Sequence, residues 1–327
     1  MNKEVLVSKI FPNVYRPQHN ILLPFYHNVN DENPVYTSYL FAIPTVQKFI
    51  EDLDYLCRRY EPVDLATVID CVENNRTLPK RSFHLTFDDG FRELYDPIAP
   101  ILLQKGIPAT FFVCSSAVDN RALLTVTLSA LIVQAAEQTG EVPPDYRDKK
   151  FSEFHTDMLW LPWREPGYAE YLRDYYDIDV DSYLQSAQPY LSSAQIRELA
   201  GKGFTFGSHS DEHLPFQDIG IERARQDIAT SVAFIRDELG VPCESFAFPF
   251  YDFDVSRDRY EALRENGVKV SFGTAGPKLD SIPFSLQRYP MSERFATRDM
   301  GDILSFLAAK DVANRLFRNS TIARAAN

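Results

Sequence analysis

The chain has 327 residues, enough for one large domain or two ordinary ones. Hydrophobic residues make up 45% and charged residues 24%, which excludes a mostly disordered chain. With 34 Lys and Arg against 46 Asp and Glu, the net charge of −12 argues against a nucleic-acid-binding protein and against broad adhesion to an anionic membrane.

Short apolar strands alternate with amphipathic helices in the first third of the chain. The strands are predicted at residues 21–27, 82–87 and 109–114. The helices are predicted at about 44–57, at 64–72 with Asp64 as its N-cap, and at about 94–102. This order is typical of a parallel sheet with crossover helices.

Residues 115–190 break the alternation, contain both tryptophans, and carry helical patterns such as 123–136. We expect a single domain over 1–327 with a largely helical insertion at about 115–190. Trp160 and Trp163 either stack on sugar rings or pack the insertion onto the rest of the domain, and packing is the preferred interpretation. Alternation then resumes, with a helix from Ser192 through Leu199, strands at 204–209, 245–250, 268–273 and 285–290, and helices at 221–239 and about 298–317.

The N-terminal sequence contains no apolar segment of signal-peptide length, and no apolar run reaches the roughly 20 residues that span a bilayer. The cysteines form no C-x-x-C pair and are expected to be buried free thiols. We therefore expect a cytoplasmic protein without an integral membrane segment. The sequence does not define its oligomeric state.

The predicted fold is α/β, with enough strand–helix units for a closed or nearly closed parallel barrel. Chemistry in such barrels gathers at the C-terminal ends of the strands. Polar residues stand at these ends in this sequence: His27, Asp88, Asp89, His209 and Arg288.

His209 and His213 are four residues apart, a spacing that can direct two imidazoles at one ion. Two histidines and one carboxylate leave coordination positions free for water and substrate, and a second carboxylate can act as a general base. Each pattern alone has an ordinary explanation. The histidines can be core or surface residues, and Asp88-Asp89-Gly90 can be a turn. Their joint position at two strand ends favours a hydrolytic metal site.

Two motifs carry a family resemblance. Residues 86–90 (Thr-Phe-Asp-Asp-Gly) and 207–213 (Gly-Ser-His-Ser-Asp-Glu-His) resemble the first two motifs of the polysaccharide deacetylases, the NodB-homology group of carbohydrate esterase family 4. Further similarity lies in residues 100–102, 106–112 and 246–250. The resemblance thus covers the chain outside about 115–190.

The resemblance implies a distorted (β/α)7 barrel that is related to the TIM barrel. It also implies metal-dependent removal of N- or O-linked acetyl groups from a sugar, polysaccharide or glycoconjugate. By position in the motifs, the metal ligands are Asp89, His209 and His213, and Asp88 is the base that acts on a metal-activated water. Phe250 matches the position whose backbone N–H stabilises the oxyanion. Zinc is the first expectation for the metal, and Co, Ni, Mn or Fe would suit the same ligands.

The chain departs from the family pattern at three places, one of which is Tyr251, where the family usually has a glycine after the aromatic residue. Ala247 stands where the third motif has the Arg that holds the catalytic Asp, and the late Leu-x-His motif that supplies the general acid is missing after residue 290. Phe25-Tyr26-His27 looks like that motif moved to the front, an order similar to that of the circularly permuted poly-N-acetylglucosamine deacetylases, which makes His27 the candidate acid. Arg288 is either the replacement for the missing Arg or an ordinary ion pair at the rim.

Two other functions stay open at this point. Hydrolysis of a non-sugar amide or cyclic amide on the same fold is suggested by Ala247 and by the missing late histidine. A catalytically inactive barrel that binds glycan is suggested by the altered third motif, although the presence of Asp88 disfavours it. The sequence does not define whether the substrate is a polymer, a lipid-linked sugar or a small molecule.

Overall fold

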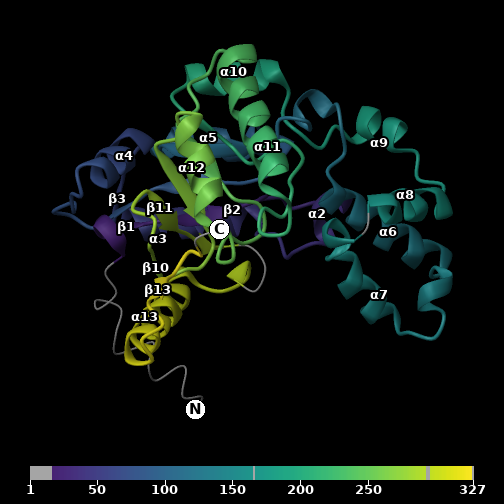
Figure 1. Ribbon diagram of the computed structural model, residues 1–327. Helices are drawn as coiled ribbons and strands as arrows, with labels where there is room; N and C mark the ends of the chain where they lie inside the picture. The colour runs from purple at the N-terminus through teal and green to yellow at the C-terminus, as the bar shows by residue number, and fades with distance from the viewer. Residues whose placement is uncertain (1–16, 165, 292–294, 326–327) are drawn as a thin grey trace.

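The computed structural model describes residues 17–164, 166–291 and 295–325. Its centre is a sheet of eight parallel segments in the order β11-β9-β8-β7-β6-β5-β2-β12, with helices packed around it (Figure 1). The segments are β2 (Pro24–Tyr26), β5 (Leu85–Phe87), β6 (Ala109–Val113), β7 (Thr205–Ser208), β8 (Ser245–Ala247), β9 (Val270–Gly273), β11 (Ser285–Gln287) and β12 (Tyr289–Pro290).

The barrel closes through one stretch of chain around Arg288. β11 pairs with β9 and β12 pairs with β2, while Arg288 alone separates β11 from β12. The two ends of the strand order are therefore consecutive in the chain, and the eight segments make a ring of seven strands. The predicted α/β barrel is confirmed.

Most helices predicted from apolar spacing are present, and their caps are those that the sequence indicates. Asp64 accepts a hydrogen bond from the Thr67 N–H, and Ser192 forms a capping box with Gln195. The helices around the barrel are α3 (Val46–Cys57), α4 (Leu65–Glu73), α5 (Ile98–Lys105), α10 (Ser193–Gly201), α11 (Ile221–Ala233), α12 (Arg257–Glu265) and α13 (Met300–Leu316).

The structure differs from the predicted elements in a few places. The helix predicted to reach residue 239 ends as an α-helix at Ala233 and continues as a π-helix over Phe234–Glu238. Cys57 is exposed rather than buried, although all four cysteines are free. The strand predicted at 21–27 is divided into β1 (Ile21–Leu22) and β2, and the strand predicted at 82–87 into β4 (Ser82–Phe83) and β5. Unpredicted elements among the described residues include α2 (Val35–Ser38), α12 and the short strands β3 (Glu61–Pro62), β10 (Leu279–Asp280) and β13 (Thr321–Ile322).

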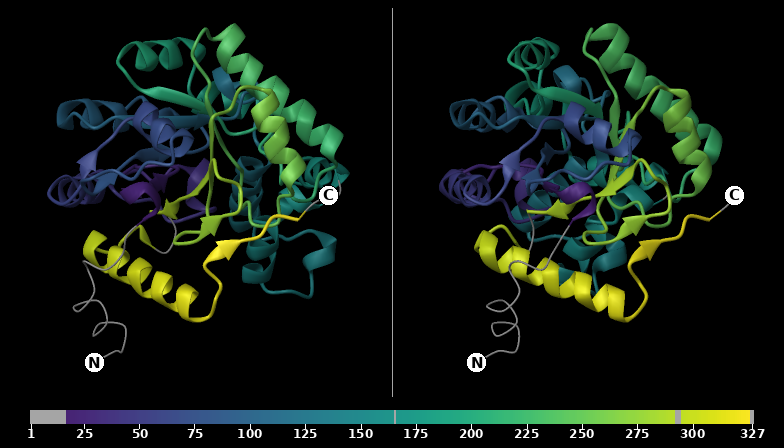
Figure 2. Two further views of the ribbon diagram at one scale, coloured as in Figure 1. Left: turned by 60° about the vertical axis from the view of Figure 1, so that its left-hand side comes forward. Right: turned by 90° about the vertical axis from the view of Figure 1, so that its left-hand side faces the viewer.

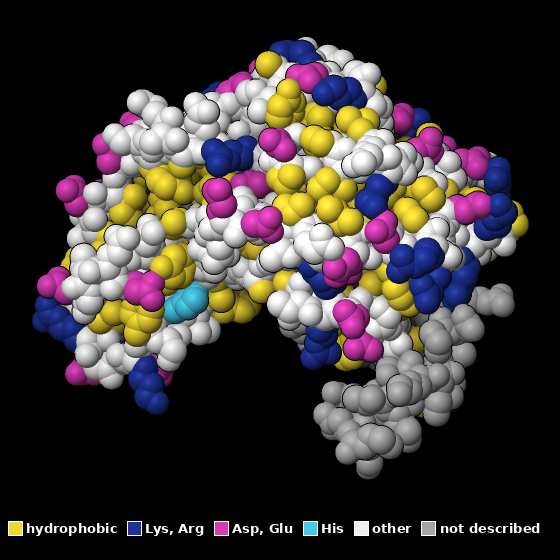
Figure 3. Space-filling view, turned by 180° about the vertical axis from the view of Figure 1, so that it is seen from behind, with side chains coloured by type: hydrophobic (Ala, Val, Ile, Leu, Met, Phe, Trp, Pro, Cys, Tyr) yellow, Lys and Arg dark blue, Asp and Glu magenta, His cyan; other side chains and the backbone are white. Residues whose placement is uncertain are grey.

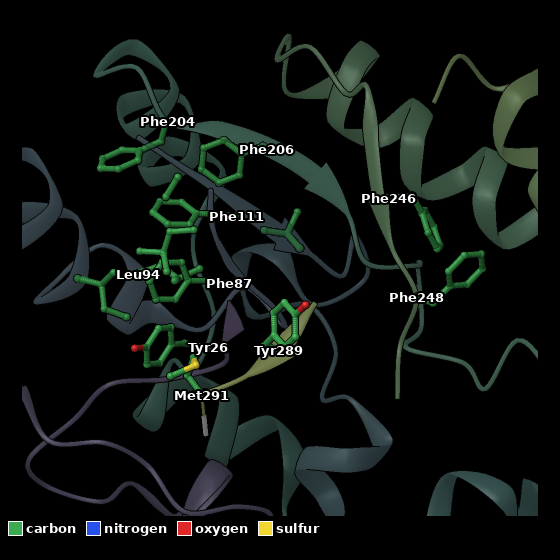
Figure 4. Close-up of a cluster of buried hydrophobic side chains, with 14 of the residues drawn as sticks. Tyr26, Phe87, Leu94, Phe111, Phe204, Phe206, Phe246, Phe248, Tyr289 and Met291 are labelled. Carbon is green, nitrogen blue, oxygen red and sulfur yellow. The ribbon is translucent and has the colours of Figure 1, made fainter. Parts of the chain in front are cut away.

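Aromatic side chains fill much of the space between the strands and the outer helices (Figure 4). The Phe111 ring centroid lies 4.9 Å from that of Phe204, 5.5 Å from that of Phe87 and 5.6 Å from that of Phe206. All four rings are buried. Burying each one removes a large apolar area from water and contributes about 1.5–3 kcal/mol. The cluster links β5, β6 and β7, and the polar residues Asp88, Asp89 and His209 follow β5 and β7.

The chain after β6 leaves the barrel and folds into α6 (Thr125–Thr139), α7 (Phe151–Met158), α8 (Pro166–Tyr175) and α9 (Val180–Ala187). These helices lie together to one side of the barrel (Figure 1) around their own apolar cluster, which includes Ile132, Phe154 and Met158. From behind, the outline of the molecule is hollowed beside this lobe (Figure 3). On another side, α13 runs along the barrel and leads to β13, which pairs with β10 (Figure 2).

No helix within the described ranges combines the length and the apolar character needed to cross a bilayer.

Candidate active site

Three buried side chains converge at the C-terminal ends of β5 and β7. Asp89 Oδ1 lies 3.3 Å from His209 Nε2 and 3.2 Å from His213 Nε2. His209 Nδ1 lies 2.8 Å from the Ala247 carbonyl oxygen, a contact in which the ring donates its proton. This hydrogen bond leaves the Nε2 lone pair directed at Asp89, the orientation that a metal-binding imidazole needs.

The donor set fits a divalent transition metal. Although Asp89 Oδ1 is buried, it accepts no hydrogen bond from the described residues, and such an oxygen is costly to leave without a partner. One carboxylate oxygen and two imidazole nitrogens lie within 4.8 Å of one another. These are ligand types that zinc and similar ions bind in hydrolytic sites, with coordination positions left open.

The protonation states of Asp89 and His213 also suit a metal. His209 would lose a proton on binding, because burial lowers its pKa but Asp88 and Asp89 raise it by more. Burial by itself would raise the pKa of the Asp89 carboxyl, but contacts with His209 and His213 hold it well below its usual range. Burial lowers the pKa of His213 in spite of the nearby carboxylate. An ionised carboxylate and a neutral imidazole are the forms that bind metal.

The loop between the two histidines is held by Asp227 of α11. Its Oδ1 accepts the Asp211 N–H at 3.0 Å, and its Oδ2 accepts the Ser210 hydroxyl at 3.1 Å. Ser210 and His213 have positive φ values of 76° and 57°, which are strained for residues with side chains and need such support. Asp227 was not among the residues predicted from the sequence, although an acid beside the apolar face of a helix was a usable signal.

Asp88 forms a buried, bidentate ion pair with Arg288. Both hydrogen bonds, Nη1 to Oδ1 and Nη2 to Oδ2, measure 2.7 Å. The Arg288 side chain is 0% exposed, donates to the Thr86 hydroxyl at 3.1 Å, and lies 4.4 Å from the Phe25 ring centroid. Burial would raise the pKa of the Asp88 carboxyl, but the charge of Arg288 lowers it. Of the two interpretations of Arg288, the structure therefore favours a dedicated partner of Asp88.

A cavity of about 340 Å³ lies over these residues. Every candidate site residue except Arg288 lines it, and Arg288 contacts Asp88. His27 stacks on Phe41 with a centroid distance of 4.5 Å. The Phe250 ring lies 4.5 Å from that of His213, and the Phe250 backbone has a φ of 59°. The structure thus brings the sequence-predicted residues together.

The cavity wall also contains residues without a sequence signal. They are Leu40 and Phe41 after α2, Val126 and Leu159 from the insertion, and Thr274 after β9. No regular spacing connects them. Because two of them belong to the insertion, the insertion forms part of the wall of the site.

The loop that carries Phe250 is held by hydrogen bonds and by a buried cluster of charged residues. The Phe250 carbonyl oxygen accepts the Thr274 hydroxyl at 3.2 Å, and Asp252 Oδ1 accepts the Thr274 N–H at 3.2 Å. Arg324 forms an ion pair with both Asp252 and Asp280, with no side chain of the three exposed. A Cβ on Gly273 would lie 2.2 Å from the Asp252 carboxyl group, so only glycine fits there. The C-terminal segment thereby holds this part of the site.

Replacing Arg324 by Met is expected to lower the free energy of unfolding by about 3–5 kcal/mol, because two buried carboxylates lose their cation. Chemical denaturation measures this change. Arg173→Met, which breaks an exposed ion pair with Asp174, is the control and should cost less than about 1 kcal/mol. Equal effects of the two substitutions would contradict the role given to Arg324.

A parallel barrel with a candidate metal site at the C-terminal ends of its strands is typical of metal-dependent hydrolases. Comparison with known proteins makes this specific: the chain belongs to the polysaccharide deacetylase family, whose model matches residues 75–271. The family resemblance seen in the motifs is confirmed. Members of this family are metal-dependent enzymes, and Asp89, His209 and His213 form the candidate site.

Individual relatives are more distant. Over 107 residues, 32% of the chain, it is 29% identical to the poly-β-1,6-N-acetyl-D-glucosamine N-deacetylase of Escherichia coli (strain K12), of which the match covers only 16%. The solved structure of the Streptococcus pyogenes deacetylase PplD with acetate is similar, with a TM-score of 0.59 and 14% identity over 88% of this chain and 97% of that one. IcaB from Ammonifex degensii gives a TM-score of 0.56 and 20% identity over 88% and 96%. The two structural likenesses show a shared fold.

Proposed function

We propose that this protein is a metal-dependent hydrolase that removes the acetyl group from N-acetylated sugars of a glycan. The carrying observation is that the buried Asp88–Arg288 pair and the Asp89–His209–His213 cluster face one cavity. Family membership supports deacetylation, and the activity of the Escherichia coli relative supports N-acetylglucosamine units as substrate. The bond broken is a C–N bond other than a peptide bond.

Asp89, His209 and His213 would hold the metal, for which zinc is our first choice. When bound, such a metal polarises the acetyl carbonyl and lowers the pKa of a water molecule. Asp88, held ionised by Arg288, accepts the proton of the attacking water. His27, on the cavity wall, gives a proton to the departing amine.

The backbone N–H of Phe250 completes this assignment by donating to the oxyanion as it develops. A preorganised donor of this kind contributes more when its loop cannot move. The hydrogen bonds of Thr274 and Asp252 behind Phe250 provide that rigidity. We assign all these roles within one catalytic domain, with the insertion as part of its wall.

Arg288 also bears on the competing functions. Ala247, in place of the family Arg, was a reason to consider an inactive barrel and, together with the missing late histidine, a non-sugar amide. Because Arg288 reaches Asp88 from another strand with two 2.7 Å hydrogen bonds, the base has the partner that Ala247 does not provide. This pair argues against the inactive barrel and removes one of the two reasons for the non-sugar amide.

The test is acetate release from N-acetylglucosamine oligomers by protein stripped with a chelator and reloaded with Zn, Co, Ni, Mn or Fe. We expect release only after a metal is returned. A cyclic imide offered in parallel should not be hydrolysed. Full activity of the stripped protein, or no release with any of these metals, would overturn the proposal.

A further inference from the structure

Aromatic rings hold the candidate proton donor His27. Its ring stacks on that of Phe41, with a centroid distance of 4.5 Å and an interplanar angle of 28°, and it meets the Phe25 ring edge-to-face at 5.4 Å. Its Nδ1 is buried and has no hydrogen-bond partner among the described residues. Phe25 belongs to the same strand as His27, so the support that comes from elsewhere in the chain is the Phe41 ring.

Phe41 takes its position from the short helix α2, which lies between the barrel and the insertion (Figure 1). The Phe41 N–H donates to the Thr37 carbonyl oxygen at 3.2 Å, which ties the chain at Phe41 to this helix. On the barrel side, the Tyr36 ring packs on that of Phe91, with centroids 5.5 Å apart. The contacts that fix α2 against the barrel therefore also fix the ring on which His27 stacks.

Glu93 provides the hydrogen bonds that fix α2. It lies in the chain that follows Asp88 and Asp89, and it is 2% exposed. Its Oε1 accepts the Tyr36 hydroxyl and, at 2.9 Å, the Asn30 side-chain N–H. Tyr36 lies within α2 and Asn30 precedes it, so one carboxylate oxygen holds this segment at two points.

The Glu93 carboxylate is an expensive group at this position. Its Oε2 is buried and accepts no hydrogen bond from the residues that the structure describes, and Arg92 Nε lies 3.8 Å from Oε1. A buried polar atom without a partner costs about 1–3 kcal/mol, which an apolar side chain would avoid. What the carboxylate provides and an apolar side chain cannot is directional hydrogen bonding in a buried place. Its presence therefore indicates a role in orienting α2.

We infer that Glu93 is a positioning residue for His27: by holding α2, it keeps the Phe41 ring against the imidazole that protonates the departing amine. This inference rests on the proposed function, in which His27 is the acid. The chain that follows β5 thereby carries the base and one metal ligand and also orients the acid. Because proton transfer needs hydrogen-bond distance to the leaving nitrogen, displacing the imidazole by about 1 Å would cost about 10²-fold in rate.

The first test uses the leaving group to separate proton donation from the other steps of hydrolysis. Glu93→Leu removes the acceptor of both hydrogen bonds and should lower kcat for acetate release from N-acetylglucosamine oligomers by about 10²-fold in the zinc-loaded protein. Its kcat for para-nitrophenyl acetate should stay unchanged, because the phenolate leaves without taking up a proton. Glu93→Gln keeps one acceptor oxygen and should retain most of the activity on the amide.

The matched control is a pair of tyrosine substitutions in the same segment. Tyr36→Phe removes a hydrogen bond to the buried Glu93 and should lower kcat for the amide by about tenfold. Tyr39→Phe removes a hydrogen bond to the exposed Glu137 and should leave kcat unchanged, because an exposed hydrogen bond is replaced by water. Equal losses on the amide and on the ester in Glu93→Leu, or no loss on the amide, would overturn the inference.

The second test does not depend on catalysis. The chain has six histidines, so NMR of histidine-labelled, metal-stripped protein can follow the His27 ring, assigned by its absence in His27→Gln. Stacking on Phe41 should shift its ring protons upfield; Phe41→Leu and Glu93→Leu should both reduce this shift, and Tyr39→Phe should retain it. Acetate release with an unchanged His27 signal in Glu93→Leu would leave the deacetylase and remove the role of Glu93. A displaced signal in that variant without acetate release from any of the proteins would keep the link from Glu93 to His27 and overturn the deacetylase.

Discussion

Arg288→Met is expected to reduce kcat for acetate release by about 10²- to 10⁴-fold, with smaller changes in KM and in bound metal. The substitution removes both hydrogen bonds that orient the Asp88 carboxylate but touches none of the candidate metal ligands. A positioned general base contributes a factor of this size. In this variant Asp88 is present but no longer positioned, and the metal site is unchanged. Steady-state kinetics and metal analysis of the same preparation check both parts.

The same substitution should also destabilise the protein, by about 3–5 kcal/mol, because Asp88 remains as a buried charge without its partner. Adding Asp88→Asn to Arg288→Met should restore most of this stability and none of the activity, since the charge is then removed as well. Arg236→Met, in an exposed pair with Asp237, is the control and should change neither quantity. Full kcat in Arg288→Met would contradict the assignment of Asp88 as the base.

Asp89→Asn is expected to abolish metal-dependent acetate release and, with it, the metal-dependent rise in Tm. The side chain keeps its size but loses the anionic oxygen that faces His209 and His213. Metal at about 100 times its Kd should stabilise the unsubstituted protein by about 2.7 kcal/mol and the variant by close to nothing. Thermal unfolding with and without zinc measures this difference independently of catalysis.

Asp237→Asn is the matched control for that experiment, because Asp237 is an exposed carboxylate in a surface ion pair. It should retain both the metal-dependent shift in Tm and the activity. If Asp89→Asn kept its metal-dependent stabilisation, the cluster at the ends of β5 and β7 would not be the metal site.

Much of the site could be predicted because parallel strands end at one rim. Asp88, Asp89 and His209 each follow an apolar strand, so the strand pattern alone places them together. Arg288 lies in the last predicted strand, so the same argument placed it at this rim. The role of Arg324 could not be predicted, because its partners Asp252 and Asp280 lie far from it in the chain and no periodic pattern connects them.

The fold itself followed the apolar pattern where that pattern was strong. Helix α12 was missed because its buried side chains are few and charged residues surround them. The strand predicted at 245–250 pairs only over β8, since the chain turns at Phe250, where φ is positive. That turn directs the loop into the site. The strand pattern therefore predicts the wrong backbone conformation at a residue whose position serves the site.

The stretch of chain that closes the barrel also determines when a newly synthesised chain can complete its active site. Asp88 is synthesised 200 residues before Arg288, an interval of about 10–40 s at ordinary rates of translation. Until then β2 has no partner on one side, and from its own synthesis β9 also lacks one, so these open edges can pair with other chains. The base is oriented by the same step that covers those edges, so an incomplete chain on the ribosome is both prone to aggregate and unable to hydrolyse a glycan.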